Sequence, residues 1–249
     1  MIWTIAGREL RSIFLSPLAW IILAVIQGLC AYFFLLYVDL FLQLQPRIAA
    51  VPGGPGITDI IIAPLFSTAA TVLLLIVPLL TMRLVSEERR SQTLSLLISA
   101  PVSMTEIILG KFVGVFSFVL IMLIFIALMP LSLLAGGSLD IGIWFSGLLG
   151  LMLLLATFCS VGLFISTLTS QPTVAAIGSF GILLLLWILN LAGSAGSSGE
   201  LFTYLSMLSH YQPLLQGNFN TADIIYYLLI TGLCLILSVH RLDADRLQH

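Results

Sequence analysis

Six long stretches of this chain are apolar and carry no charged residue near their middle. Each is long enough to cross a bilayer, because about 20 helical residues span the roughly 30 Å hydrocarbon core. The expected spans are residues 18–38, 60–81, 106–130, 141–168, 173–192 and 222–239. Charged residues make up 8% of the sequence, whereas a soluble domain averages about 25%. We therefore predict an all-α polytopic membrane protein, with residues 1–249 forming one transmembrane domain.

Residues 1–16 precede the first span and mix two kinds of side chain. Arg8, Glu9 and Arg11 are surrounded by apolar and aromatic residues, a composition typical of an amphipathic helix lying along the membrane surface. Pro17 is expected to mark the bend into the first span. The apolar stretch that follows is longer than the core of a signal peptide and is not closed by a small-residue cleavage site. We therefore predict that it is a retained membrane helix.

The largest polar segment lies between the second and third spans, at residues 82–111. It holds four of the nine Lys and Arg residues and three of the eleven acids: Arg83, Arg89, Arg90, Lys111, Glu87, Glu88 and Glu106. Ser86 has the side chain of an N-cap, which would place two acids at the positive end of a helix dipole. Pro101 would stop that helix. The pattern predicts a short amphipathic helix at about 87–100. The alternative is an ordinary loop resting on the lipid headgroups.

Two further motifs mark the beginning of the third span. Ser103 and Glu106 have the spacing of a capping box, which predicts a helix start there. Lys111 is then placed to extend its amine toward water. Gly110 and Gly114 form a GxxxG pattern, which is typical of close helix packing. We interpret it as packing within one bundle, with a dimer face as the alternative.

A second short helix is expected before the last span. Residues 193–199 are rich in Gly and Ser, which indicates a turn or loop. The segment 200–208 then places Leu201, Leu205 and Leu208 on one face. It is too short to cross a bilayer, so we predict an interfacial or re-entrant helix on the outer side.

The distribution of basic residues predicts the orientation. With the N-terminus inside, eight of the nine Lys and Arg residues lie on the cytoplasmic side, and only Arg47 lies outside. This satisfies the positive-inside rule. Both termini and the polar segment would then be cytoplasmic, while the loops at 39–59 and 193–220 would face outward.

The sequence also indicates which chemistry the chain does not carry. Proton- and sodium-coupled transporters usually keep a charged residue within a span, and none lies near the middle of these spans. We expect the polar residues in the spans to form hydrogen bonds between helices rather than contact a substrate. They are Gln27, Thr71, Thr157, Ser160, Ser179 and Asn190.

Metal, nucleotide and nucleic-acid sites are not expected in this chain. Its three His residues, His210, His240 and His249, are too far apart along the sequence to predict a metal site. No P-loop pattern occurs, and no basic patch has the density that nucleic-acid binding requires. The three Cys residues lack paired spacing, so we expect them to be reduced. A membrane bundle of this kind, without an energy source of its own, is expected to be driven by a partner.

The polar segment resembles a motif of the ABC-2-type exporter permeases. Residues 86–103 read SEERRSQTLSLLISAPVS, similar to that family's E-x-x-x-G-T-L-E-x-L-L-x-x-P-[VIL]-S. In that family the segment is a coupling helix that docks into a groove of the ATPase subunit. The resemblance implies ATPase contacts at Glu87, Glu88, Arg89, Thr93, Leu94, Leu97, Pro101 and Ser103. The sequence departs from the motif at Gln92, where Gly is frequent, and at Ser95, where an acid is common.

The segment 204–227 resembles one branch of that family. It looks like the outer segment and sixth helix of the gliding-motility-associated and nitrous-oxide-reductase-maturation permeases, whose pattern is near His-[Phe/Tyr]…Gly…Asp…Tyr. The matching positions are His210, Tyr211, Gly217, Asp223 and Tyr226. This resemblance implies a multi-pass protein of the bacterial inner membrane, embedded in the lipid bilayer.

The resemblance also implies partners and a function. Family members place two six-span permease subunits, identical or different, against two ATPase subunits that bind ATP and Mg²⁺. The named branch often adds a membrane-anchored protein with a periplasmic domain. The expected function is the permease subunit of an ATP-driven exporter, not itself an enzyme and without a cofactor. The alternatives are a self-sufficient transporter or channel, and a non-transporting complex that moves an envelope partner.

Overall fold

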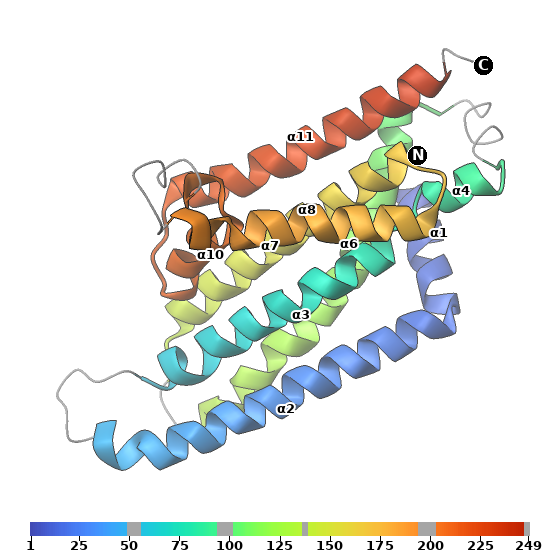
Figure 1. Cartoon of the computed structure of the whole chain (residues 1–249). Coiled ribbons are helices and arrows are strands. Elements are labelled where there is room, and N and C mark those ends of the chain that lie inside the picture. Colours follow the sequence, from blue (N-terminus) through green and yellow to red (C-terminus); the bar gives the residue numbers. More distant parts are fainter. Residues whose placement is uncertain (49–55, 94–101, 136–138, 194–202, 247–249) are drawn as a thin grey trace.

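The computed structural model describes residues 1–48, 56–93, 102–135, 139–193 and 203–246, and every regular element in these ranges is helical. Six long helices lie side by side, and α1 crosses one end of the bundle (Figure 1). The elements are α1 (Ile2–Leu15), α2 (Pro17–Ile48), the π-helix η1 (Thr58–Ile62), α3 (Ala63–Thr81), α4 (Ser86–Arg90), α6 (Met104–Leu131), the 3₁₀-helix η2 (Ser132–Ala135), α7 (Ile141–Leu168), α8 (Pro172–Gly193), α10 (Met207–Leu215) and α11 (Thr221–Arg246).

The all-helical fold with six membrane-spanning helices is confirmed. Six helices in the described ranges are long and apolar enough to cross a membrane. Two of them, α2 and α11, extend several residues past the predicted limits, because a helix continues beyond its apolar stretch where local polar pairs support it. In α2, Gln43 donates a hydrogen bond to Asp39 one turn earlier, at 2.9 Å. In α11, Arg241 pairs with Asp245 at 3.7 Å.

Helix α7 lies at the centre of the bundle and is the most buried of the long helices. Its glycines let neighbouring helices approach closely. A Cβ at Gly162 would lie 2.0 Å from Thr81 Oγ1 of α3, and a Cβ at Gly150 would lie 2.9 Å from Leu214 Cβ of α10. Any larger side chain at these positions would push the helices apart.

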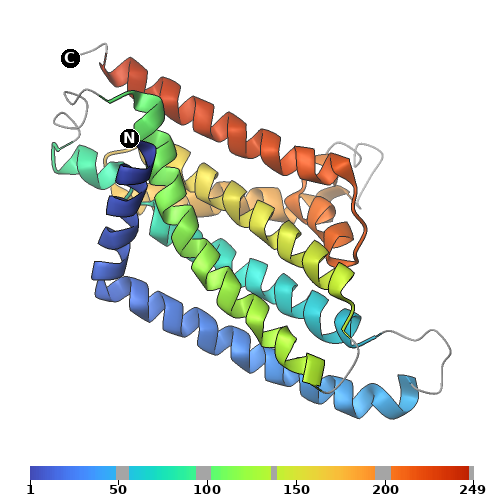
Figure 2. The same ribbon diagram turned by 180° about the vertical axis from the view of Figure 1, so that it is seen from behind.

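Helix α1 packs on the beginning of α6 through the GxxxG pattern. A Cβ at Gly110 would lie 2.7 Å from Ile5 Cβ, and a Cβ at Gly114 would lie 2.7 Å from Glu9 Cβ. The predicted packing within one bundle is therefore confirmed. Figure 2 shows α1 turning sharply into α2 at the end of the bundle, and the break falls at Ser16, just before the predicted Pro17.

Candidate coupling site at the charged end of the bundle

The short helix α4 follows α3 at the end of the bundle that also carries the first residues and the end of α11 (Figure 1). Its N-cap is Val85, not the predicted Ser86. The reason lies in α7, where Ser166 Oγ accepts hydrogen bonds from the backbone N–H groups of Val85 and Ser86, both at 3.1 Å. The same hydroxyl donates to the carbonyl of Met82 at 3.1 Å. A side chain of another helix thus caps α4.

Helix α4 ends at Arg90, so a break at residues 91–93 interrupts the predicted helix at 87–100, and residues 94–100 of that prediction lie outside the described residues. Gln92 has φ = 57°, the left-handed conformation that ends many helices. The Thr93 N–H bonds to the Glu88 carbonyl at 3.0 Å, and the Gln92 N–H bonds to the Arg89 carbonyl at 3.3 Å. These two bonds form a Schellman motif. The family's frequent Gly at this position fits the same backbone geometry, because Gly adopts positive φ without a Cβ clash.

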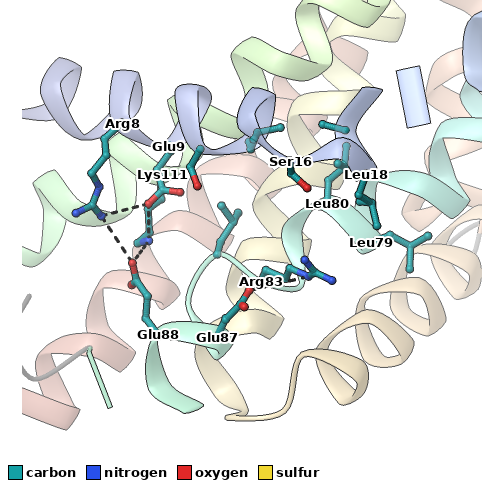
Figure 3. A pocket seen from close by; sticks show the side chains of 14 residues that line it. Arg8, Glu9, Ser16, Leu18, Leu79, Leu80, Arg83, Glu87, Glu88 and Lys111 are labelled. Carbon is teal, nitrogen blue, oxygen red and sulfur yellow. Dashed lines mark hydrogen bonds and ion pairs between the residues drawn. The ribbon is translucent and has the colours of Figure 1, made fainter. Parts of the chain in front are cut away.

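A buried ion cluster joins α4 to α1 and α6. The Lys111 side chain is 1% exposed, and its Nζ lies 2.7 Å from Glu88 Oε1 and 2.9 Å from Glu9 Oε1. Arg8 flanks the same two carboxylates at 3.4 and 3.8 Å. Figure 3 shows the four side chains pointing toward one another across the gap between α1 and α4. We call Arg8, Glu9, Glu88 and Lys111 the Lys111 cluster.

The Lys111 cluster corrects one prediction. Lys111 does not extend toward water, because two carboxylates from other elements reach its amine inside the protein. Removing one partner from a buried pair typically costs about 3–5 kcal/mol, since the remaining charge is left uncompensated. The cluster therefore links the placement of α1, α4 and α6 mainly through one buried ammonium group, with Arg8 as an exposed second cation.

The opposite side of α4 is tied to the last helix. Arg89 forms a short ion pair with Asp245 of α11, and Arg241 flanks the same carboxylate. Side chains of α1, α6, α7 and α11 thus hold the five residues of α4. Two buried atoms of α4, Glu88 Oε2 and Arg89 Nε, have no hydrogen-bond partner within the described residues.

The residues implied as ATPase contacts are placed in three ways. Glu87 is 58% exposed and Thr93 is also exposed, whereas Glu88 and Arg89 turn toward the chain's own helices. Ser103 forms the predicted capping box with Glu106, with reciprocal 3.2 Å bonds. The others, Leu94, Leu97 and Pro101, lie outside the described residues.

Several residues at this end were missing from the predicted set, above all Glu9, Lys111, Ser166 and Asp245. A charged Lys111 beside Gly110 in an otherwise apolar helix signals burial, because a GxxxG face seldom points to water. Nothing local indicates its partners, since Glu9 lies 102 residues away in the sequence. The other two are likewise distant from α4 in the sequence.

At the other end of the bundle, the structure brings together three of the five predicted residues of the outer segment, His210, Asp223 and Tyr226. Of the predicted helix at 200–208, residues 200–202 lie outside the described residues and residues 203–205 are helical, and α10 begins at Met207 after a break at Ser206. His210 Nδ1 lies 2.6 Å from Asp223 Oδ1, and its ring stacks on Tyr226 with centroids 4.1 Å apart. His210 Nε2 lies 2.8 Å from the Tyr204 carbonyl. Because a carbonyl can only accept, this nitrogen is the donor.

Hydroxyl groups fix α10 to the neighbouring helices. Tyr211 donates to the Phe66 carbonyl of α3 at 3.1 Å, and Tyr227 of α11 donates to the Met207 carbonyl at 2.7 Å. Burial raises the pKa of Tyr211 well above its ordinary value, so the hydroxyl stays a donor. Gly217 follows with φ = 82°, a conformation that favours glycine. A Cβ there would meet Ile143 at 3.0 Å.

Polar residues within the spans form internal hydrogen bonds. Gln27 of α2 donates to the Met122 carbonyl of α6 at 3.0 Å, and Thr157 of α7 lies 3.1 Å from the Thr231 hydroxyl of α11. The prediction of bonds between helices is confirmed for these two. Hydroxyls of three other residues donate to carbonyls one turn earlier in their own helices: Thr71, Ser160 and Ser179.

The comparisons with known proteins agree with this architecture. The model of the family described as "ABC-2 family transporter protein" matches residues 3–240. No curated protein gave a significant match to the chain. Membrane subunits of this family generally pair with an ABC ATPase and are normally not enzymes themselves. Because the match covers nearly the whole chain, this multi-pass membrane protein belongs to the ABC-2 transporter family.

Proposed function

We propose that this chain is the permease subunit of an ATP-driven ABC-2 complex and that α4, with the segment that follows it, receives the motion of a separate ATPase subunit. The observation that carries the proposal is the attachment of α4 to four helices at once. A five-residue helix has little stability of its own. Because α4 is bonded to four other helices, a force that displaces α4 would also act on most of the bundle.

Each of these contacts connects α4 to a different helix of the bundle. Ser166 connects the start of α4 to the central helix α7. The Lys111 cluster connects it to α1 and α6, and Asp245 connects it to α11. Glu87 and Thr93, both exposed, would contact the ATPase subunit directly.

The remaining parts of the assembly follow from the family and the charge distribution. ATP and Mg²⁺ would be bound by the ATPase subunit, and a second permease subunit would pair with this one. Both termini and α4 would face the cytoplasm of a bacterial cell, since that orientation satisfies the positive-inside rule. The cluster around His210 and Asp223 supports the gliding-motility and nitrous-oxide-reductase-maturation branch, although the family match does not separate the branches.

A second candidate function is the transmission of movement to an envelope partner without transport. The hydroxyl and amide groups of Gln27 and Thr157 bond to neighbouring helices, and α10 is fixed to the bundle at the outer end. The Gln27 amide nitrogen and the Thr157 hydroxyl are already bonded and are poorly placed to line a polar pathway within one subunit. The buried Gln27 Oε1 has no partner among the described residues. ATPase activity that rises only with a periplasmic protein, and not with candidate substrates, would favour this function.

Replacement of the docking segment tests the proposal. Residues 86–103 would be exchanged for a Gly/Ser linker of equal length, and a Gly/Ser exchange of residues 49–55, in the loop predicted to face outward, would serve as the control. We expect the first exchange to abolish co-purification of the ATPase subunit and the second to preserve it. Equal recovery of the ATPase from both variants would refute docking at α4.

A further inference from the structure

A cavity of about 560 Å³ lies beside the Lys111 cluster, between α1, the beginning of α2, the end of α3 and α4. Figure 3 shows its two different walls. Charged side chains line one end, and Leu18, Leu79 and Leu80 line the other. Ser12 and Ser16 lie between them, along α1 and the bend into α2. The cavity therefore offers a polar and an apolar half.

The polar wall has no net charge, but its charged residues differ in how closely they are paired. It carries three cations and three acids: Arg8, Arg83, Lys111, Glu9, Glu87 and Glu88. Two of the acids are occupied by Lys111. In contrast, Arg83 and Glu87 are 52% and 58% exposed and only 4.0 Å apart, the limit of an ion pair. This neighbouring cation and anion remain available to a ligand of matching charges.

The apolar wall continues onto the outer surface of the bundle. Leu79 is 46% exposed, and Leu75, one turn earlier on α3, is 54% exposed. Leu18 and Ile21 are exposed in the same way along the first turns of α2. In a membrane-spanning bundle such leucines face acyl chains. A molecule with its head in the cavity can therefore extend its tail along these helices.

We propose that this cavity binds a phospholipid with a phosphoethanolamine headgroup. The phosphate accepts charge-assisted hydrogen bonds from Arg83, the primary ammonium donates to Glu87, and an acyl chain lies along Leu18 and Leu79. A purely anionic headgroup would meet Glu87 without a compensating cation, and a choline headgroup has no N–H to donate. The lipid would join the bend between α1 and α2 to α4 in the permease without its ATPase subunit, where Glu87 is not engaged in docking, and this is an addition to the proposed coupling function.

Native mass spectrometry of the permease purified without its ATPase subunit tests the proposal. Phosphatidylethanolamine, phosphatidylglycerol and phosphatidylcholine of equal chain length would compete for retention. We expect preferential retention of the first lipid. Arg83→Gln should reduce its retention by about tenfold, which corresponds to about 1.4 kcal/mol. Glu87→Gln should abolish the preference over phosphatidylcholine while some lipid is still retained.

Two further variants guard against misfolding as an explanation. Ser12→Trp places a large ring in the cavity from the exposed side of α1 and should displace the lipid. Arg11→Gln removes a cation of the same helix that does not line the cavity and should change nothing. Equal retention of the three lipids, a preference for phosphatidylglycerol, or insensitivity to both Arg83→Gln and Ser12→Trp would each overturn the proposal. Because no ATPase is present, none of these results bears on docking.

Discussion

The two ends of this bundle hold their short helices by different means. At the charged end, α4 is held mainly by side-chain ion pairs with α1, α6 and α11. At the other end, α10 is held by hydroxyl groups that donate to backbone carbonyls, as in the bond from Tyr211 to Phe66. Ion pairs can exchange partners while staying satisfied, whereas a carbonyl has a fixed position in its helix. We therefore expect α4 to shift during function and α10 to stay in place.

The largest expected effect is the loss of the buried cation. Lys111→Met leaves Glu9 and Glu88 with only the exposed Arg8 as a counter-charge, so the free energy of unfolding should fall by about 3 kcal/mol, the lower end of the cost of breaking a buried pair. The measurement is unfolding in detergent followed by tryptophan fluorescence. Neutralising both acids in the same variant, with Glu9→Gln and Glu88→Gln, should recover most of the loss. A single variant as stable as the wild type would show that the charged end does not depend on this group.

The next effect concerns the attachment of α1. Gly114→Ala would place a Cβ 2.7 Å from Glu9 Cβ and 3.1 Å from the Ala6 carbonyl, and this overpacking should cost about 1–3 kcal/mol. Gly28→Ala is the matched control, because nothing lies within 4 Å of a Cβ there. Protease protection of residues 1–16 should decrease only in the first variant. Equal protection in both would contradict the close packing of α1 on α6.

At the outer end, we expect a single hydroxyl group to contribute modestly to the free energy of unfolding. Tyr211→Phe removes the donor to the Phe66 carbonyl while preserving the ring, and it should cost about 0.5–1.5 kcal/mol. Thermal unfolding of the purified permease is the measurement. Tyr32→Phe, on the exposed face of α2, is the control and should have no effect. A cost at Tyr211 as large as that of Lys111→Met would remove the distinction between the two ends.

The smallest effect is expected at the end of α4. Gln92→Gly relieves a left-handed residue at φ = 57° and should stabilise the protein by about 0.5 kcal/mol, since relief of strain is partly offset by chain entropy. Ser91→Gly, at a position with φ = −82°, should be neutral or destabilising. Hydrogen exchange of the Thr93 amide gives a local readout. Faster exchange in Gln92→Gly than in the wild type would argue against the Schellman motif.

Local patterns in the sequence predicted the six spans, the break before Pro17 and the capping box at Ser103. They failed where contacts are distant in the sequence. The burial of Lys111 depends on Glu9 of α1, and the start of α4 depends on Ser166 of α7. The early end of α4 escaped prediction because Gln92 lacks the usual signal of glycine.

The outer helix could have been placed better from the sequence. Met207, Tyr211, Leu214 and Leu215 are spaced at i, i+4, i+7 and i+8, and they form the buried face of α10. Of the helix predicted at 200–208, residues 203–205 are helical, but Leu205 is exposed and does not belong to the buried face. Tyrosine at the second position of this face was a further sign of burial with a hydrogen-bond partner.

The packing of α1 on Gly110 and Gly114 has a consequence for biogenesis. Ribosomes add roughly 5–20 residues per second, so these glycines emerge roughly 5–20 s after α1 has been made. During that interval the first helix lacks its main packing surface and must rest on the lipid surface, which its mixture of apolar and charged residues permits. Insertion of the third span then provides the packing surface for α1. Helix α1 is therefore made before this span but reaches its final position only after the span has inserted.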